Sequence, residues 1–382
     1  RNSATAEIPG GIAVDVSSLF KGNLIKDTAG SNGDGIYAPG DLPAVFWIQD
    51  NQLTDNTGHG LYTTNGTQVH FVRNRVTNNG KFGLYLKSSA GSVSSSWFLG
   101  NTTGIRSEDS DLDVSNSVIA QSTSFSSGYG IFAKEGQISI RNSTITQNRR
   151  GVQLDSVPTH LVANSILDQN SQGDLHGAEL GGVHSNLISD GMFAGSNGNE
   201  RWDPRFTNAL AGDYSLRDRN SPAVDMADPD YPSGPVDALG MERSVDGDND
   251  GQPKPDIGAL EYGSTSWVPL VLPVLSSSPQ DFVGIAMVNT AQEPARVTLK
   301  GYSNGGSLVA GPYEVDVASG TQFSKLLTEV LPGLKQGWVQ ITTNKPDLMS
   351  FTMLGREGLI YMDGTDLSGA ISPRLLLPEM KS

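Results

Sequence analysis

The residues with the clearest potential chemistry are aspartates spaced two apart. Asp246, Asp248 and Asp250 alternate in the segment DGDNDG. Alternate carboxylates can converge on one hard cation, while the glycine permits the sharp turn of such a loop. An EF-hand would place a bidentate Glu where Ile257 stands, so the spacing predicts a looser calcium site completed by Asp256. An acidic turn without a ligand is the alternative interpretation.

A second set of aspartates lies in the segment SEDSDLDVSNS. Asp109, Asp111 and Asp113 alternate there, so they share one face of a strand. The repeat described below places Asp113 opposite Ser139, with Arg141 two residues further along on the same face. Aspartates that hold calcium against a uronate, with an arginine as the base, can cleave a polysaccharide. Asp111, Asp113 and Arg141 are therefore candidate catalytic residues, and a solvated outer face of the solenoid is the alternative.

The first half of the chain, which must position these residues, is repetitive. A glycine, followed by an apolar residue in every case but the last, recurs at intervals of 21 to 26 residues, at Gly11, Gly35, Gly60, Gly83, Gly104, Gly130, Gly151 and Gly173. Short apolar strands alternate with Asn-rich and Gly-rich corners between these steps, as in QISIRNS. A fixed period in this range is typical of a solenoid, in which each repeat packs on its neighbours.

Two columns of asparagine follow the same period. Alignment on Asn142 gives a first column of Asn51, Asn74, Asn116 and Asn164, with Ser95 in one coil, and a second column of Asn56, Asn79, Asn101, Asn148 and Asn170. Asparagine tolerates the left-handed backbone of a sharp corner, and stacked amides can bond from coil to coil. Both columns therefore have a structural explanation.

Composition narrows the class further. The 382 residues include 45 Gly and no Cys, and the net charge is −15. This charge disfavours nucleic acid and anionic lipid as partners. The absence of Cys excludes a disulfide framework, and no apolar run is long enough to span a membrane. The chain begins at Arg1 rather than at Met, so we expect that a leader or upstream segment has been removed.

The repeat over residues 9–178 resembles the right-handed parallel β-helix family, the pectin-lyase-like superfamily. The resemblance implies an all-β fold, a right-handed parallel β-helix over residues 1–178. The resemblance does not select one activity, because the superfamily includes polysaccharide lyases, glycoside hydrolases and surface proteins without catalysis. Gly58-His59-Gly60 matches a motif of the polygalacturonase-like hydrolases. The paired aspartates of those enzymes are missing, and the repeat already requires Gly60, so His59 is interpreted as a structural residue.

Residues 179–262 form a different block. The segments DPRF, GDYSL, SPAVD and DIGALEY occur in this order and resemble the terminal region of bacterial surface β-helix proteins. The resemblance implies that this block closes the last coils of the solenoid and contains the acidic loop. It also implies an extracellular or cell-surface location.

Residues 263–382 read as separate strands joined by Gly, Asn and Pro turns. They resemble a β-sandwich module of secreted bacterial proteins. Prolines flank two apolar segments, 267–275 and 372–378, which predicts edge strands. Such edges could pair with the open end of another copy's solenoid through residues Trp267, Val268, Leu270, Leu375, Leu376 and Leu377.

The sequence therefore predicts a secreted structural or adhesive protein that assembles head to tail into a filament, with calcium as a possible ligand. A polysaccharide lyase is the first alternative. A glycan-binding protein without turnover, acting on surface glycans, is the second.

Overall fold

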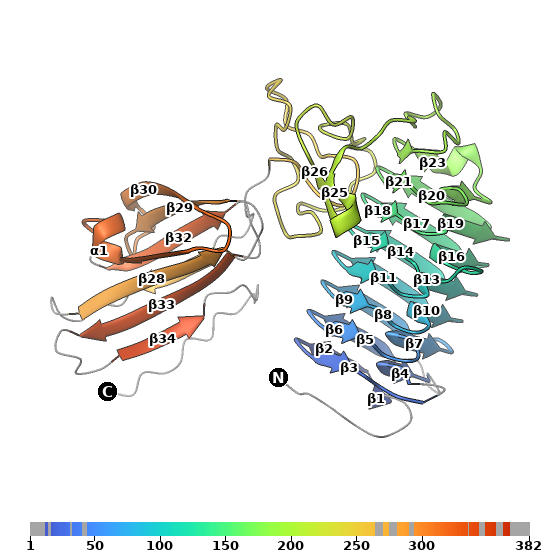
Figure 1. Ribbon diagram of the computed structural model, residues 1–382, viewed down its shortest axis with the longest axis horizontal. Coiled ribbons are helices and arrows are strands. Elements are labelled where there is room, and N and C mark those ends of the chain that lie inside the picture. The colour runs from blue at the N-terminus through green and yellow to red at the C-terminus, as the bar shows by residue number, and fades with distance from the viewer. Residues whose placement is uncertain are drawn as a thin grey trace. The chain divides into compact units, whose positions relative to one another are not determined.

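The computed structural model describes residues 12–13, 17–30, 33–39, 44–263, 270–274, 281–289, 294–334, 336–343, 348–356 and 362–366. The chain divides into two compact units, Arg1–Gly263 and Ser264–Ser382. The first unit is a parallel β-solenoid, as the repeat predicted (Figure 1). No helix in the described ranges is long and apolar enough to cross a membrane.

Three parallel sheets of eight strands each form the walls of the solenoid. Sheet 1 contains β1 (Ile12–Ala13), β4 (Ile36–Ala38), β7 (Leu61–Thr64), β10 (Phe82–Lys87), β13 (Thr103–Glu108), β16 (Tyr129–Lys134), β19 (Arg150–Asp155) and β22 (Leu175–His176). Sheet 2 contains β2 (Ser18–Lys21), β5 (Val45–Gln49), β8 (Gln68–Val72), β11 (Ala90–Ser94), β14 (Asp111–Ser115), β17 (Gln137–Arg141), β20 (Thr159–Ala163) and β23 (Val183–His184). Sheet 3 contains β3 (Leu24–Lys26), β6 (Gln52–Thr54), β9 (Arg75–Thr77), β12 (Trp97–Leu99), β15 (Val118–Ala120), β18 (Thr144–Thr146), β21 (Ile166–Asp168) and β24 (Leu187–Ile188).

The repeated glycine has a packing role. Gly60 begins a coil directly against Gly83 of the next coil, and a Cβ atom on Gly60 would lie 2.5 Å from the Gly83 carbonyl oxygen. The apolar residue after each glycine points inward, so that Leu61 and Leu84 stack in register and are fully buried. The Gly-apolar step therefore marks a place where neighbouring coils approach too closely for a Cβ atom.

The second predicted asparagine column is confirmed. The Asn56 side chain donates to Asn79 (2.8 Å), Asn79 donates to Asn101 (2.8 Å), and Asn148 donates to Asn170 (3.1 Å). All five asparagines are buried, and their side chains also bond to backbone groups. These side chains therefore bond neighbouring coil corners directly to one another.

The alignment of the first column was wrong by one residue in four coils, where Ser95, Asn116, Asn142 and Asn164 had been placed. The buried, coil-to-coil column consists of Asn51, Asn74, Ser96, Ser117, Ser143, Ser165, Asn186 and Asn199. Asn116, Asn142 and Asn164 occupy the preceding corner position, where φ is +46°, +42° and +51°. Asparagine suits both adjacent positions, the left-handed corner and the buried rung, so residue type alone could not separate them.

Within the block of residues 179–262, only a short segment around Asn199 and Glu200 closes the end of the solenoid. Asn199 accepts hydrogen bonds from the backbone and side chain of Asn186, and Ile188 donates its backbone N–H to Glu200. The elements η1 (Leu180–Gly182), β25 (Phe206–Asn208), η2 (Ala209–Ala211) and β26 (Asp213–Leu216) belong to the same block.

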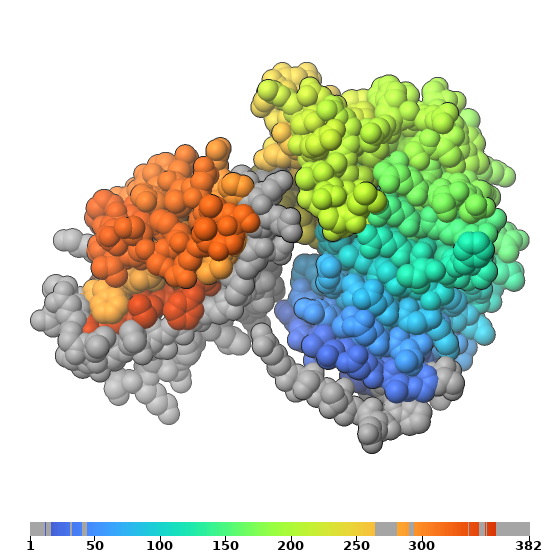
Figure 2. All heavy atoms as spheres, viewed as in Figure 1, coloured from blue at the N-terminus to red at the C-terminus, as the bar shows by residue number. Residues whose placement is uncertain are grey.

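Residues 206–262 instead cover the flank of the solenoid, and this segment is called the flank segment below. Phe206, Tyr214 and Val224 share a hydrophobic cluster with outward side chains of sheet 3, among them Val118 and Ile166. Figure 2 shows part of this segment, in yellow-green, against the coils. The sequence predicted an end closure, whereas most of the block lies along the side of the solenoid.

The second unit contains two four-stranded antiparallel sheets that share one core, as predicted for a β-sandwich. One sheet has the order β27 (Leu270–Val274), β32 (Gly337–Thr343), β29 (Ala295–Tyr302) and β30 (Leu308–Val317). The other has the order β31 (Gln322–Leu326), β28 (Asp281–Asn289), β33 (Leu348–Arg356) and β34 (Met362–Asp366), and a short helix, α1 (Leu327–Val330), follows β31. The position of β27 at a sheet edge agrees with the edge predicted from its proline.

Candidate functional site

A groove runs along the outer face of sheet 2, parallel to the stacking direction of the coils. Its volume is about 360 Å³, and it crosses β8, β11, β14, β17 and β20. The lining residues are Gln68, His70, Ala90, Gly91, Ser92, Asp111, Leu112, Asp113, Gln137, Ile138, Ser139, Thr159, His160 and Leu161. Most of them belong to two outward columns that alternate with the buried core.

Small side chains in one coil create the hollow. Strand β11 contributes only Ala90, Gly91 and Ser92 to the groove, whereas β8 contributes Gln68 and His70 on one side. A Cβ atom on Gly91 would lie 2.5 Å from a Leu86 methyl group, so a larger residue there would displace the Leu86 side chain. The short side chains of β11 therefore lie between longer ones on the neighbouring coils.

An aromatic pair lies at the end of the groove nearest the first coils. Trp47 is in register with His70, and their rings stack at a centroid distance of 4.0 Å. The Nδ1 atom of His70 lies 3.0 Å from the Ser92 hydroxyl oxygen inside the groove. Trp47 remains 49% exposed. A large exposed aromatic next to hydroxyl and amide groups is suited to stacking against a sugar ring.

The structure brings Asp113 and Arg141 together. Asp113 is opposite Ser139, as the repeat predicted, and Nη2 of Arg141 lies 3.0 Å from both carboxylate oxygens. Nη1 of Arg141 donates to the Pro232 carbonyl oxygen of the flank segment (2.9 Å). Asp111 lies in the neighbouring column, where it accepts the backbone N–H of Gln137 (2.9 Å). The ion pair neutralises Asp113 and fixes the guanidinium. Asp111, in contrast, has no cationic partner among the described residues.

His59 is part of the solenoid wall. Its imidazole is 6% exposed, and its Nδ1 atom accepts the backbone N–H of Phe82 (3.1 Å). Burial, followed by the positive charges of Lys81 and Arg106, lowers the pKa of His59 to about 3. A neutral imidazole bonded to the backbone agrees with the structural role expected for this residue.

Sheet 1 carries an aromatic column on its outer face that was not predicted from the sequence. Tyr37, Tyr62, Tyr85, Arg106 and Phe132 are in register on its outer face. The first two rings are 5.3 Å apart, the next pair 4.8 Å, and the guanidinium lies 4.5 Å from the Phe132 ring centroid. These faces cover one another, which favours a structural role over sugar stacking. The sequence did contain a signal for this column, because each of these residues directly follows a Gly-apolar step.

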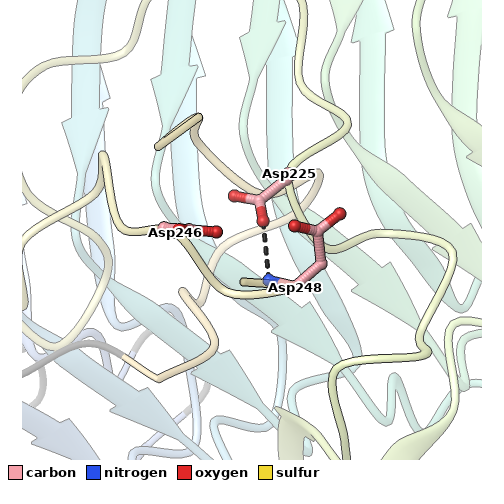
Figure 3. A group of neighbouring side chains, drawn as sticks. All are labelled: Asp225, Asp246 and Asp248. Atoms are coloured by element: carbon pink, nitrogen blue, oxygen red, sulfur yellow. Dashed lines mark hydrogen bonds between the residues drawn. The ribbon is translucent and has the colours of Figure 1, made fainter. Parts of the chain in front are cut away.

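A group of three aspartates forms the candidate metal site (Figure 3). Carboxylate oxygens of Asp225, Asp246 and Asp248 all lie within 4.8 Å of one another, and the backbone N–H of Asp248 donates to Asp225 Oδ2 (2.8 Å). Asp246 Oδ1 is buried and has no hydrogen-bond partner among the described residues. Asp246 and Asp248 are two of the four predicted ligands, whereas Asp225 comes from the distant segment SPAVD and was not predicted.

The other two predicted ligands lie outside this group. Asp250 is exposed and accepts hydrogen bonds from the backbone and side chain of Gln252. Asp256 is fully buried, and its two carboxylate oxygens accept the backbone N–H groups of Asp225 and Tyr262. Its oxygens are thus used to hold the backbone of the flank segment.

Asp256 belongs to a buried ionic cluster around Arg243. The Arg243 guanidinium donates to Asn116 Oδ1 (2.8 Å) and to the Gly258 carbonyl oxygen (2.9 Å), and lies 3.4 Å from Glu261 Oε2. Burial raises the pKa of Asp256 to about 7 and, together with the charge of Asp256, that of Glu261 to about 9. The cluster connects the flank segment to a corner of the solenoid, and we assign it a structural role.

Most residues predicted for assembly are outside the described ranges. Trp267, Val268, Leu375, Leu376 and Leu377 are among them, and Leu270 begins the edge strand β27. The structure therefore adds only the position of β27 to that hypothesis.

Comparisons with known families support the fold. Residues 7–133 match the family described as "Right handed beta helix region". Together with the three parallel sheets, this match shows that the first unit is a right-handed parallel β-helix. Residues 82–209 match a more particular family, described as "Periplasmic copper-binding protein (NosD)". No curated protein matches the chain.

Solved structures of phage tailspikes are distantly similar. The enzymatically active domain of tailspike protein 2 from bacteriophage CBA120 has 12% identity and a TM-score of 0.31, over 95% of this chain and 62% of the tailspike domain. The corresponding domain of tailspike protein 4 from the same phage has 9% identity and a TM-score of 0.22, over 88% of this chain and 61% of that domain. The chain thus spans less than two thirds of either tailspike domain.

Proposed function

We propose that the β-helix unit binds an extended glycan chain in the groove of sheet 2 and does not cleave it. The observation that carries this proposal is the groove itself, in which two columns of mostly polar side chains lead away from the Trp47–His70 stack. Concave sites with an aromatic side and a few convergent polar groups are typical ligand sites. The columns run along the stacking direction, so a linear chain of similar units suits them better than a compact ligand.

Arg141 is the main reason to propose binding without turnover. A lyase needs a base that is free to accept a proton beside a carboxylate or metal that holds the substrate. Here the guanidinium is committed to Asp113 and to the Pro232 carbonyl oxygen. Inverting or retaining hydrolysis needs two available carboxylic groups, and Asp113 is ion-paired.

Affinity electrophoresis through gels containing different polysaccharides tests the proposal. We expect at least one polysaccharide to retard the protein, and Trp47→Ala to weaken binding about tenfold, because one aromatic contact contributes on the order of 1 kcal/mol. Phe125→Ala is the matched control, since this side chain is 94% exposed on a loop outside the groove. Equal retardation of both variants would contradict binding at the groove. Unsaturated products or new reducing ends that disappear in Asp113→Ala would establish a lyase or hydrolase instead.

We also propose that calcium binds among Asp225, Asp246 and Asp248. Hard cations prefer carboxylate oxygens, and the unpartnered Asp246 Oδ1 is available as a ligand. A cation that binds only the folded chain stabilises it by mass action. Excess chelator should therefore lower the melting temperature and millimolar calcium should restore it. Asp248→Asn should abolish this response and Asp250→Asn should preserve it, whereas an unchanged melting curve with and without chelator would refute the site.

Copper is not proposed for this chain, although the matched family description mentions it. Copper prefers imidazole, thiolate and thioether ligands, and the chain has no Cys and five His. His160, His176 and His184 each have Nε2 close to a backbone carbonyl oxygen. Within the described ranges, the one group of three or more His, Asp or Glu side chains close enough to hold a metal ion consists of aspartates.

A location outside the cytoplasm remains part of the proposal. It is supported by the word "periplasmic" in the matched family description and by the resemblance of residues 179–262. Head-to-tail assembly stays a prediction, and the mass of the intact chain in solution at high concentration tests it.

A further inference from the structure

The charges around the groove restrict the kind of glycan that it can hold. Two carboxylates, Asp111 and Asp113, line it, and no Lys or Arg does. Arg141 is not among the lining residues, and its guanidinium donates hydrogen bonds to the Asp113 carboxylate and to the Pro232 carbonyl oxygen. The uncompensated charge in the groove is therefore the negative charge of Asp111.

The remaining polar groups suit hydroxyl groups. Gln68, Gln137, Ser92, Ser139 and Thr159 can each donate or accept a hydrogen bond. Carboxylate oxygens accept charge-assisted hydrogen bonds from sugar hydroxyls, which are stronger than bonds between neutral groups. A uronate or sulfate, in contrast, needs a cationic partner and would meet a like charge at Asp111.

We infer that the groove selects a neutral polysaccharide and rejects polyuronates. This inference rests on the proposed function, and it goes further by naming the class of glycan. The lyase alternative drawn from the alternating aspartates requires a uronate as the substrate, whereas this inference excludes a uronate as the ligand. The net charge of −15 adds a longer-range repulsion of polyanions that salt screens.

A matched pair of ligands tests the inference. The probe is a neutral oligosaccharide that the intact protein binds in a panel of glucans, mannans and galactans, together with the same oligosaccharide oxidised at C6 to its uronate. Titration calorimetry at pH 8, where an ordinary imidazole is uncharged, should show the neutral form binding about tenfold more tightly or better. High salt should narrow this ratio.

Asp111→Asn separates charge from shape, because Asn keeps an oxygen that can accept the Gln137 N–H. The variant should bind the uronate several-fold more tightly than the intact protein does, so that the neutral-to-uronate ratio narrows. Asp155→Asn, at an exposed position on sheet 1, should leave the ratio unchanged. Melting curves of both variants check that the fold is retained.

The outcomes distinguish the two proposals. If the uronate binds as tightly as the neutral form, and Trp47→Ala still weakens both, the groove binds glycans but the inferred class is wrong. An unchanged ratio in Asp111→Asn would likewise overturn the role of Asp111. If no glycan binds, or if Trp47→Ala has no effect on binding, the proposed function fails and this inference fails with it.

Discussion

Burial determines what individual carboxylates do in the β-helix unit. Asp111 is exposed in the groove, where its charge can select a ligand, whereas Asp168 is only 5% exposed in sheet 3. Burial, followed by the negative charges of Asp174 and Asp203, raises the pKa of Asp168 to about 6. A raised pKa means that the folded chain holds this proton more tightly than the unfolded chain. The stabilisation that comes from this tighter binding of the Asp168 proton is thus complete below about pH 4 and is lost as the pH rises through about 6.

Asp168→Asn should therefore stabilise the protein at neutral pH. The amide has no charge to bury, so the free energy of unfolding should rise by about 2 kcal/mol at pH 7.5 and change little at pH 4. Denaturant unfolding at the two pH values measures this difference. The exposed Asp155→Asn is the control, and its effect should be small at both. An equal gain for Asp168→Asn at pH 4 would show that charge burial is not the cause.

Residues of the candidate sites were predictable only where neighbours in space are also neighbours in the chain, as in the Asp246–Asp248 loop, or in the repeat. The period placed Asp113 opposite Ser139, with Arg141 two positions along. Asp225 could not be found in this way, because it reaches Asp246 and Asp248 through the fold of the flank segment. Trp47 was not predicted as a site residue because its place in the candidate site depends on stacking with His70 one coil away, and a single Trp or His in the sequence does not indicate such a pair.

At the scale of elements, stability depends on polar columns as well as on apolar ones. Asn79 is 2% exposed and joins three coils, since it accepts from Asn56 and donates to Leu53 O (3.1 Å) and Asn101 Oδ1 (2.8 Å). The period predicted this column correctly because Asn occupies it in most coils. The neighbouring column mixes Asn with Ser, and this mixture is the reason that its register was misassigned.

Asn79→Ala should be strongly destabilising. It leaves buried groups on the adjacent coils without partners, which costs about 2 to 4 kcal/mol in total. Asn78→Gly provides the control at the adjacent corner, where φ is +55° and glycine is unstrained. Urea unfolding monitored by circular dichroism should give a clearly lower midpoint for Asn79→Ala alone. Equal midpoints for the two variants would contradict a stabilising polar column.

At the scale of the whole molecule, the two units have separate cores. The two hydrophobic clusters of the first unit contain residues between Ile12 and Tyr262, and the cluster of the sandwich contains residues between Val283 and Leu354. In the described part of the chain, no cluster includes residues of both units. Each unit therefore has what a domain needs to fold alone.

Truncation after Gly263 tests this independence. The shortened chain should keep the β-helix, its melting temperature and its glycan affinity, because the groove and the flank segment are retained. Calorimetry of residues 1–263, residues 264–382 and the full chain should show that the two transitions of the full chain match those of the fragments. A fall of about 5 °C or more in the β-helix transition would indicate that the units stabilise each other.

The position of the flank segment also sets an order of events during synthesis. The outer face of sheet 3 is polar in its early strands, with Gln52, Thr54 and Arg75, and apolar in its later ones, with Val118 and Ile166. The early coils can thus emerge from the ribosome and fold without a cover. The later coils must wait for residues 206–262 with an apolar flank open to solvent, where partly folded chains aggregate. A translational pause before Trp97 is therefore harmless, whereas a pause between Ile188 and Phe206 leaves that surface open to other nascent chains.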